Sequence, residues 1–210
     1  KVFFRVFLKK IPATLADLII VNSKGSAESF IRLTKIDRKK IITVYNPFDF
    51  KKVSFRARSK SIDLCFVGRL EAQKNPMLFL HLSHLLRLLH PSFTIGIVGS
   101  GRFFETLESE IERRGLSSCI RLQAYSPQNA SDCFACSKFS LLTSFYEGMP
   151  NVILESLHHR CIPFSFDIRS GPAEILNESY LVDPYDIPSF LQKFNRQYIN
   201  YKTVYKSFDF

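Results

Sequence analysis

A chain of 210 residues, of which 46% are apolar and 14% aromatic, can bury the core of one full domain and part of a second. It has no run of about 18 uninterrupted apolar residues, so we expect no membrane-spanning helix. The net charge of +10 lies in the first part of the chain, because residues 1–60 carry 15 Lys or Arg against 4 Asp or Glu. This asymmetry argues against a uniformly cationic nucleic-acid binder and leaves two interpretations: a solvated surface, or a face attracted to an anionic membrane.

The opening stretch, residues 1–10, superficially resembles a signal peptide. Arg5 breaks its apolar run and no small-residue cleavage site follows, so we interpret it as interior sequence whose upstream part is missing. Five cysteines, an odd number, lie mostly in apolar runs, which favours buried thiols in a reducing compartment. We therefore expect a cytoplasmic location, with peripheral contact to the inner face of the membrane if residues 1–60 bind it. The cysteines are Cys65, Cys119, Cys133, Cys136 and Cys161.

The first part of the chain contains two predicted strands and one helix. The apolar run of residues 16–21 predicts a buried strand, and Ser23 predicts a cap for a helix over residues 24–35. A second apolar run, residues 41–47, predicts another strand. The polar, basic stretch 48–61 that follows has no clear period, so we expect a linker or an exposed loop.

From residue 61 onward, apolar strand patterns alternate with amphipathic helix patterns. Such alternation needs parallel crossovers, and near-continuous apolar strands indicate a sheet covered on both faces. We therefore expect a doubly wound parallel α/β domain with a partial second domain, whose ligands bind at the carboxyl ends of the strands. The strands are predicted at residues 62–68, 93–99, 119–125, 139–143, 161–166 and 180–182, and the helices at residues 76–90, 102–114, 127–136, 151–160 and 186–199.

The loop after the first of these strands carries two cations. Gly68 permits a tight exit from the strand. Arg69 and Lys74 follow it, and Asn75-Pro76 predicts a helix start directly after them. Two cations beside a helix N-terminus suit a diphosphate. The alternative is a surface loop whose charges form ordinary ion pairs.

The loop after the second strand contains Gly99 and Gly101, which let a backbone turn approach a ligand closely. Phe104 stands where a dinucleotide-binding fingerprint has its third glycine, and this strand is not the first of the domain. Nicotinamide binding is therefore not expected. Tight packing between strand and helix explains both glycines equally well.

Residues 144–156 place two acids around a predicted helix start. Glu147 lies in the loop and Glu155 within the helix, which Pro150 or Asn151 opens. The free N–H groups of a helix start suit an anion. One carboxylate can accept hydrogen bonds from sugar hydroxyls, and the other from a ribose.

The string from Glu147 to Glu155 resembles the Glu-x7-Glu signature of the retaining GT-B glycosyltransferases, specifically glycosyltransferase family 4. Further segments follow that family in order, namely ADLIIVNS, VYNPFD, and FVGRLEAQKNP through LVDPYD. The resemblance covers most of the chain and implies a Rossmann-like GT-B C-terminal domain. The implied divisions are a remnant of the N-terminal acceptor domain at residues 1–48, a linker at 49–60, the nucleotide-sugar-binding domain at 61–184, and a C-terminal helix and tail at 185–210.

The resemblance implies a role for each matching residue. Arg69 and Lys74 match the pair that holds the donor diphosphate. Glu147 matches the acid that bonds the donor sugar, and Glu155 the acid that holds the ribose. Glu147, Arg69 and Lys74 are the expected catalytic set, with no metal, no cofactor and no assigned protein nucleophile. The expected donor-binding residues are Gly68, Gly99, Gly101, Tyr125, Ser126, Gly148, Met149, Pro150, Asn151, Val152 and Glu155, of which Tyr125 or Ser126 would contact the base.

The implied function is retaining transfer of a hexosyl or N-acetylhexosaminyl group, with UDP as the expected nucleotide. The implied acceptor is a glycan or a lipid-linked molecule in surface polysaccharide or glycolipid synthesis, since residues 167–176 resemble a loop of bacterial members with that task. Most of the acceptor-binding half is absent from the sequence, so we expect the isolated chain to be inactive. The alternative is a nucleotide-sugar-binding module, or half of a split or inactive transferase that needs a partner chain.

The sequence departs from the family at the end of the predicted helix 151–160. His158, His159 and Arg160 replace the small residues and glycine that are usual there, which predicts a weaker helix end.

Two further residue pairs invite a metal or redox interpretation. Cys133 and Cys136, and likewise His81 and His84, lie three residues apart in predicted helices without further ligands in register, so we expect packing or partial exposure.

No motif interleaves aromatic and basic residues on one face, so nucleic acid is not an expected partner.

Overall fold

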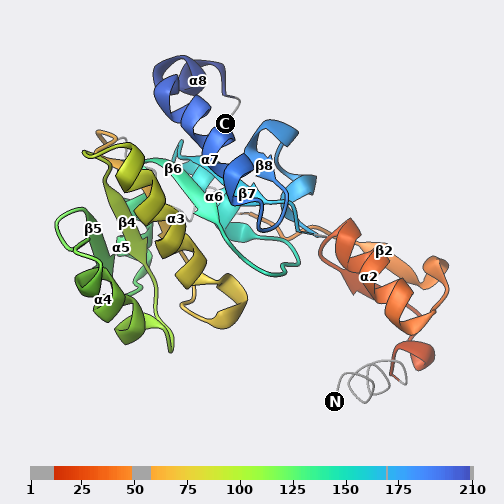
Figure 1. Cartoon of the computed structure of the whole chain (residues 1–210). Helices are drawn as coiled ribbons and strands as arrows, with labels where there is room; N and C mark the ends of the chain where they lie inside the picture. The colour runs from red at the N-terminus through yellow and green to blue at the C-terminus, as the bar shows by residue number, and fades with distance from the viewer. Residues whose placement is uncertain (1–11, 49–57, 169, 209–210) are drawn as a thin grey trace.

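The larger sheet has six parallel strands in the order β5-β4-β3-β6-β7-β8. The order reverses at the centre, where β3 pairs with β4 on one side and with β6 on the other (Figure 1). This is the doubly wound parallel sheet expected from the sequence, and each predicted strand is confirmed within a few residues. The strands are β3 (Ile62–Val67), β4 (Ile95–Val98), β5 (Ile120–Gln123), β6 (Ser137–Leu142), β7 (Ile162–Phe166) and β8 (Leu181–Val182).

The structure is a computed structural model that describes residues 12–48, 58–168 and 170–208. The signal-like stretch 1–10 and most of the predicted linker lie outside the described residues.

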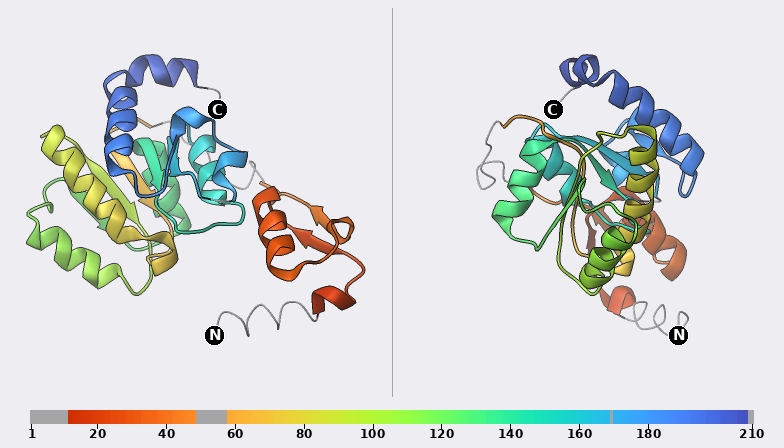
Figure 2. Two further views of the ribbon diagram at one scale, coloured as in Figure 1. Left: turned by 45° about the vertical axis from the view of Figure 1, so that its right-hand side comes forward. Right: turned by 60° about the vertical axis from the view of Figure 1, so that its left-hand side comes forward.

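Helices cover both faces of the sheet (Figure 2). Because side chains alternate along a strand, Leu64 and Phe66 of β3 face one layer of helices, and Cys65 and Val67 face the other. The first layer consists of α3 (Pro76–Leu89), α4 (Phe104–Arg113) and α7 (Ile187–Ile199). The second consists of α5 (Pro127–Cys136) and α6 (Asn151–His158).

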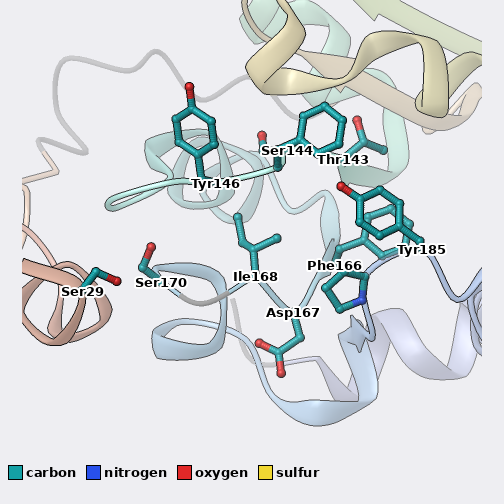
Figure 3. Close-up of a pocket in the computed structure, with 11 residues that line it drawn as sticks. Ser29, Thr143, Ser144, Tyr146, Phe166, Asp167, Ile168, Ser170 and Tyr185 are labelled. Atoms are coloured by element: carbon teal, nitrogen blue, oxygen red, sulfur yellow. The ribbon is translucent and has the colours of Figure 1, made fainter. Parts of the chain in front are cut away.

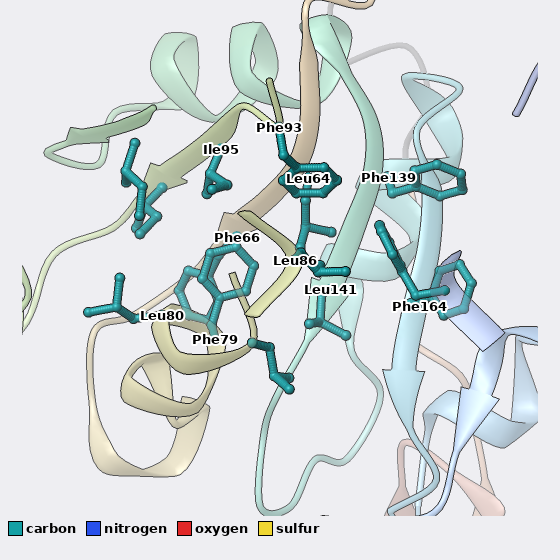
Figure 4. Close-up of a cluster of buried hydrophobic side chains, with 14 of the residues drawn as sticks. Leu64, Phe66, Phe79, Leu80, Leu86, Phe93, Ile95, Phe139, Leu141 and Phe164 are labelled. Atoms are coloured by element: carbon teal, nitrogen blue, oxygen red, sulfur yellow. The ribbon is translucent and has the colours of Figure 1, made fainter. Parts of the chain in front are cut away.

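The core of the first layer is rich in phenylalanine (Figure 4). Phe66 of β3 packs on Phe79 of α3, with ring centroids 5.3 Å apart. Phe139 of β6 makes an edge-to-face contact with Phe164 of β7, with centroids 5.9 Å apart. Phe194 of α7 is fully buried against both. Burying such rings contributes about 1.5–3 kcal/mol each, which fixes the frame that carries the loops.

The C-terminal part of the chain holds a helix that the sequence did not predict. The predicted helix 186–199 ends at Ile199, as α7 does, but α8 (Tyr201–Ser207) follows after a break at Asn200. Tyr201 packs its ring on Phe139, with centroids 5.4 Å apart. α8 therefore extends the apolar layer over the sheet.

The N-terminal part forms a small unit of its own. β1 (Ile19–Val21) and β2 (Ile41–Thr43) pair in parallel, and α2 (Lys24–Thr34) connects them. Ser23 caps α2 as predicted, since its hydroxyl accepts the Ser26 N–H at 3.0 Å. Several large apolar side chains of this unit are more than 45% exposed, namely Leu15, Leu18, Ile20, Leu33, Ile42 and Val44.

The end of α6 corrects one expectation. His158, His159 and Arg160 were expected to weaken the helix end, yet it is closed by two hydrogen bonds, from Arg160 N–H to Leu157 O and from Cys161 N–H to Ser156 O, both 2.9 Å. This pattern is a Schellman motif, whose left-handed position is usually glycine. Arg160 occupies that position with φ 53°. The helix end is therefore tight, and its cost is backbone strain rather than fraying.

The cysteines pack in the fold rather than forming a chemical site. Cys65, Cys119, Cys133 and Cys161 are buried and Cys136 is half-buried, all as free thiols. Over residues 12–48, 58–168 and 170–208, no group of three or more His, Cys, Asp and Glu side chains has a metal-binding arrangement. Within the same ranges, no helix combines the length and hydropathy that crossing a membrane requires.

Candidate donor-binding site

Two loops meet at the switch point, one after β3 and one after β6. They are joined through main-chain groups of the β3 loop: Thr143 Oγ1 donates to the Lys74 carbonyl oxygen at 2.8 Å, and Phe145 N–H donates to the Gln73 carbonyl oxygen at 2.9 Å. Gln73 Nε2 donates in return to Tyr146 O at 2.9 Å. Residues 73 and 146 are far apart in sequence, so these bonds hold the two loops in one fixed arrangement.

Lys74 and Glu147 form an ion pair across the two loops. The distance from Lys74 Nζ to Glu147 Oε1 is 2.5 Å, and the side chains are only 14% and 9% exposed. Ser144 Oγ donates to the same carboxylate oxygen at 2.6 Å, and Ser170 Oγ donates to the Glu147 carbonyl oxygen. The structure thus brings Lys74 and Glu147 together, but of the two only Lys74 lines the cavity beside them.

A cavity of about 330 Å³ opens beside this ion pair. Six of the residues singled out from the sequence line it: Gly68, Arg69, Lys74, Tyr125, Val152 and Glu155. Val67 and Ser100 also line it and were not predicted. Ser100 lies between Gly99 and Gly101, and its hydroxyl accepts the Tyr125 N–H at 3.1 Å. Its position between two glycines that were predicted to approach a ligand could have indicated Ser100 as a lining residue.

Two cations line the cavity, and they differ in exposure. Arg69 is exposed, and its guanidinium donates to Gln73 Oε1 at 3.0 Å. Lys74 reaches the cavity from the opposite end of the same loop. The two cations that line the cavity can accommodate an anion such as a diphosphate.

Glu155 lies on the α6 side of the cavity and is half-buried. Burial raises the pKa of its carboxyl above the ordinary value, and the nearby Lys74 charge offsets part of that effect. A carboxylate that is held out of water in this way is a good hydrogen-bond acceptor for hydroxyl groups of a ligand.

The glycines of the β4 loop serve the packing of the loops. A Cβ atom at Gly99 would lie 2.3 Å from the Gly68 carbonyl oxygen, and one at Gly101 would lie 2.5 Å from the Leu70 carbonyl oxygen. Gly101 also has φ +149°. Neither residue lines the cavity. The alternative of tight packing therefore accounts for both glycines.

Ser126 differs from its predicted neighbour Tyr125. Its hydroxyl accepts the Asn129 N–H at 3.0 Å and caps α5, and it does not line the cavity. Tyr125 lines the cavity and is 55% exposed. Of the two candidates for a contact to the base, only Tyr125 faces the space where a ligand fits.

The helix start after Glu147 lies where the sequence analysis expected it. α6 begins at Asn151, after Pro150, and no side chain caps its first turn within the described ranges. Gly148 approaches the N-terminal unit so closely that a Cβ atom there would lie 2.6 Å from Asn22 Oδ1. Asn46 Nδ2 donates to Asn151 Oδ1 at 2.9 Å. Met149 is half-buried and Pro150 buried.

A contact that the sequence did not predict joins the N-terminal unit to this loop region. Glu174, in the segment 170–176, accepts hydrogen bonds from the N–H groups of Lys24 at 2.9 Å and Gly25 at 3.0 Å, and from Tyr45 Oη at 2.9 Å. A carboxylate at the N-terminus of α2 is favoured by the helix dipole. Burial raises the pKa of Glu174, but the bonds from Gly25, Lys24 and Tyr45 outweigh it and the net pKa is lowered.

A parallel doubly wound sheet with a cation-bearing loop and an uncapped helix start at its switch point is an architecture common among nucleotide-binding α/β proteins. Residues 47–204 match the family model described as glycosyl transferases group 1, so the chain belongs to this family.

Individual relatives are similar in sequence. The chain is 26% identical over 180 residues to a Campylobacter jejuni α-1,4-N-acetyl-D-galactosaminyltransferase whose name specifies an undecaprenol-linked substrate; the match covers 83% of this chain and 47% of that protein. It is 29% identical over 195 residues to the lipopolysaccharide 1,6-galactosyltransferase of Salmonella typhimurium, covering 87% and 53% of the two chains. The chain thus spans about half the length of the curated relatives it matches.

Solved structures are similar in fold. Anabaena HepE in complex with UDP and glucose superposes with a TM-score of 0.81 at 18% identity, covering 97% of this chain and 59% of HepE. Staphylococcus aureus TarM, in a complex containing UDP, gives a TM-score of 0.80 at 18% identity, covering 94% and 42% of the two chains. At these identities the likeness shows the fold alone.

Proposed function

We propose that this chain binds a nucleotide-diphosphate sugar in the cavity between the β3 and β6 loops, as the donor half of a retaining glycosyltransferase of family 4. The observation that carries the proposal is the Lys74–Glu147 ion pair beside a cavity that Arg69 and Glu155 also line. The UDP in the HepE and TarM complexes supports a UDP-sugar as the donor, and the names of the relatives support a glycan or lipid-linked molecule as the acceptor, in surface polysaccharide or glycolipid synthesis.

In this proposal the diphosphate is the leaving group. Arg69 and Lys74 stabilise the negative charge that grows on it as the glycosidic bond breaks, together with the free N–H groups at the start of α6. Glu147 accepts hydrogen bonds from the sugar hydroxyls, and Glu155 accepts them from the ribose. No metal or protein nucleophile has a part in it. The acceptor hydroxyl attacks the same face of the sugar that the diphosphate leaves, and its proton passes to the departing phosphate oxygen.

Calorimetric titration tests donor binding directly. The chain is titrated with UDP, GDP and ADP, and then with the corresponding hexose and N-acetylhexosamine donors. Selective binding of one nucleotide, with loss in the Lys74→Ala variant, is the expected result. No binding of any nucleotide, or RNA binding that salt removes, would contradict the proposal.

The N-terminal unit has exposed apolar side chains, such as Ile20 at 65% and Leu15 at 80% exposure. Such an apolar face favours packing against another protein segment. Transfer is therefore assayed with the chain alone and after an N-terminal half is supplied. Donor binding with no transfer in either assay would indicate the second candidate function, a nucleotide-sugar-binding module or an inactive half.

Peripheral contact with the inner face of a membrane is also part of the proposal. Its support is the basic excess of residues 1–60, 15 Lys or Arg against 4 acids. Each basic residue near an anionic surface contributes about 1 kcal/mol. Co-sedimentation with phosphatidylglycerol vesicles that is lost at high salt, and absent with phosphatidylcholine vesicles, is the expected result.

A further inference from the structure

A second pocket, which we call the aromatic pocket, opens on the other side of the 143–147 loop. It encloses about 310 Å³ and is lined by Ser29 of α2 and by residues at or just after the ends of three neighbouring strands. These residues are 143–146 after β6, 166–168 and 170 after β7, and 184–185 after β8. Figure 3 shows Tyr185 and Phe166 at one end of the pocket, Ser29 and Ser170 at the other, and Ile168 between them. None of the donor-site functions proposed above uses this space.

Exposed aromatic rings form one wall of the pocket. Phe145 is 47% and Tyr185 58% exposed, and their ring centroids lie 6.0 Å apart. Phe166, which is buried, stacks beneath Tyr185 at 6.5 Å with an interplanar angle of 22°. Large aromatic rings that stay exposed inside a concave surface mark a ligand site more often than a gap in packing.

Tyr185 is held in an unfavourable backbone conformation. Its φ is +66°, a region that a bulky residue rarely adopts. Such strain costs about 1–3 kcal/mol and is retained where the surrounding structure fixes a side chain for a purpose. Here the conformation places the ring over Phe166 at the mouth of the pocket.

The charge of the pocket selects among ligand classes. Its described lining residues include the carboxylate of Asp167 and no Lys, Arg or His. A diphosphate or a second nucleotide would lack a counter-ion there. The hydroxyls of Ser144 and Ser170 are already bonded to Glu147, but those of Ser29 and Tyr146 provide polar groups that a purely hydrocarbon ligand would leave without partners. A neutral pyranose ring has both an apolar C–H face and hydroxyls, and it fits this combination.

The pocket adjoins the donor site through a short chain of contacts. Ser144 lines the aromatic pocket and donates to Glu147 Oε1 at 2.6 Å. Glu147 pairs with Lys74, which lines the donor cavity. A sugar in the aromatic pocket therefore lies one side chain away from the carboxylate that we assign to the donor sugar.

We propose that the aromatic pocket is an acceptor subsite that holds one neutral pyranose ring of the acceptor glycan against Phe145 and Tyr185. The proposal rests on the function proposed above, since only a transferase needs an acceptor beside Glu147. It also assigns the segments after β7 and β8 a part in choosing the acceptor.

The test measures glycoside binding and nucleotide binding on the same variants. Methyl α-galactoside, methyl α-N-acetylgalactosaminide and methyl α-glucoside are each offered to the chain at up to about 10 mM, with and without saturating UDP, and followed by saturation-transfer NMR. Tyr185→Asn removes the ring while keeping a residue type that tolerates positive φ. Ser29→Phe fills the pocket from α2 without changing the strand loops.

At least one glycoside should bind the wild-type chain with a millimolar Kd, and both variants should weaken it about tenfold or more. Both should keep their UDP affinity within about twofold. Tyr125→Ala, at a tyrosine of similar exposure in the donor cavity, should weaken UDP binding and leave glycoside binding unchanged.

The outcomes separate the two proposals. UDP binding without any glycoside binding, or glycoside binding that both pocket variants retain, overturns the acceptor subsite alone. Inorganic pyrophosphate that displaces the glycoside also overturns it, because the pocket would then be an anion site. Failure of the wild-type chain to bind UDP overturns the proposed function.

Discussion

Lys74 Nζ lies 2.5 Å from Glu147 Oε1, so an ion pair joins the two loops at the switch point. A diphosphate that binds Lys74 must share it with Glu147. Removal of Lys74 and removal of Glu147 should therefore have different effects on UDP affinity, although each residue is needed for transfer.

Lys74→Ala should weaken UDP binding about 10- to 100-fold, which corresponds to the 1.5–3 kcal/mol of a hydrogen bond to a charged group. Glu147→Ala should leave UDP affinity unchanged or slightly tighter, because it frees Lys74, while abolishing any gain in affinity from the sugar. Both variants should abolish transfer in the complete enzyme. Calorimetry with UDP and with UDP-sugars measures the first two effects.

A control is the ion pair between Lys138 Nζ at the start of β6 and Asp63 Oδ1 of β3, at 2.6 Å, with a similarly buried carboxylate and a lysine that is 27% exposed. Lys138→Ala should lower the Tm without changing nucleotide affinity. If Lys138→Ala weakened UDP binding as much as Lys74→Ala does, the effect of Lys74 would be one of stability and not of contact.

Glu155 provides a pH-dependent prediction. Burial raises the pKa of its carboxyl, so the folded protein binds a proton more readily than the unfolded chain does. Its ionised form therefore costs stability as pH rises through the raised pKa, and the cost is absent below the ordinary pKa near 4.5. Glu155→Gln should raise the Tm at pH 7 and change it little at pH 4.

The same substitution should weaken nucleotide binding if Glu155 accepts hydrogen bonds from the ribose. In the wild-type chain, nucleotide binding should weaken as pH falls, because the Glu155 carboxyl becomes protonated. Since the pKa of this carboxyl is raised, the weakening should begin at a higher pH than it would for an ordinary glutamate. The variant should lose that pH dependence. A variant with wild-type affinity at every pH would exclude Glu155 from the site. Calorimetry between pH 4.5 and 8 gives the measurement.

The bonds to Glu174 should be measurable one amide at a time. Glu174→Ala removes the acceptor of the Lys24 and Gly25 N–H groups, so hydrogen exchange at these two amides should accelerate about 10- to 100-fold. Glu178→Ala, at an exposed glutamate in the neighbouring turn, should leave both amides protected. Equal acceleration in the two variants would mean that the exchange reports general loosening.

The sequence predicted the frame better than the contacts between its parts. The strands could be placed because buried parallel strands such as Ile62–Val67 are continuous apolar runs, and the meeting of Lys74 with Glu147 follows from the rule for strand ends. The hydrogen bonds of Glu174 to α2 could not be predicted, because they depend on how the N-terminal unit packs against the loops. α8 was missed because the break at Asn200 has no proline or glycine to mark a new helix.

Arg160 leads to a prediction about stability. It holds the left-handed position of the Schellman motif after α6, with φ 53°, where glycine avoids the steric cost. Arg160→Gly should therefore stabilise the domain by about 0.5–1 kcal/mol, after the greater chain entropy of glycine is subtracted. For a domain of this size the Tm should rise by about 1–4 °C. Arg160→Ala removes the same guanidinium but keeps a Cβ atom in the strained position, so it should gain much less. Thermal unfolding of the two variants separates these causes, and an equal gain in both would show that the side chain, and not the backbone, carries the cost.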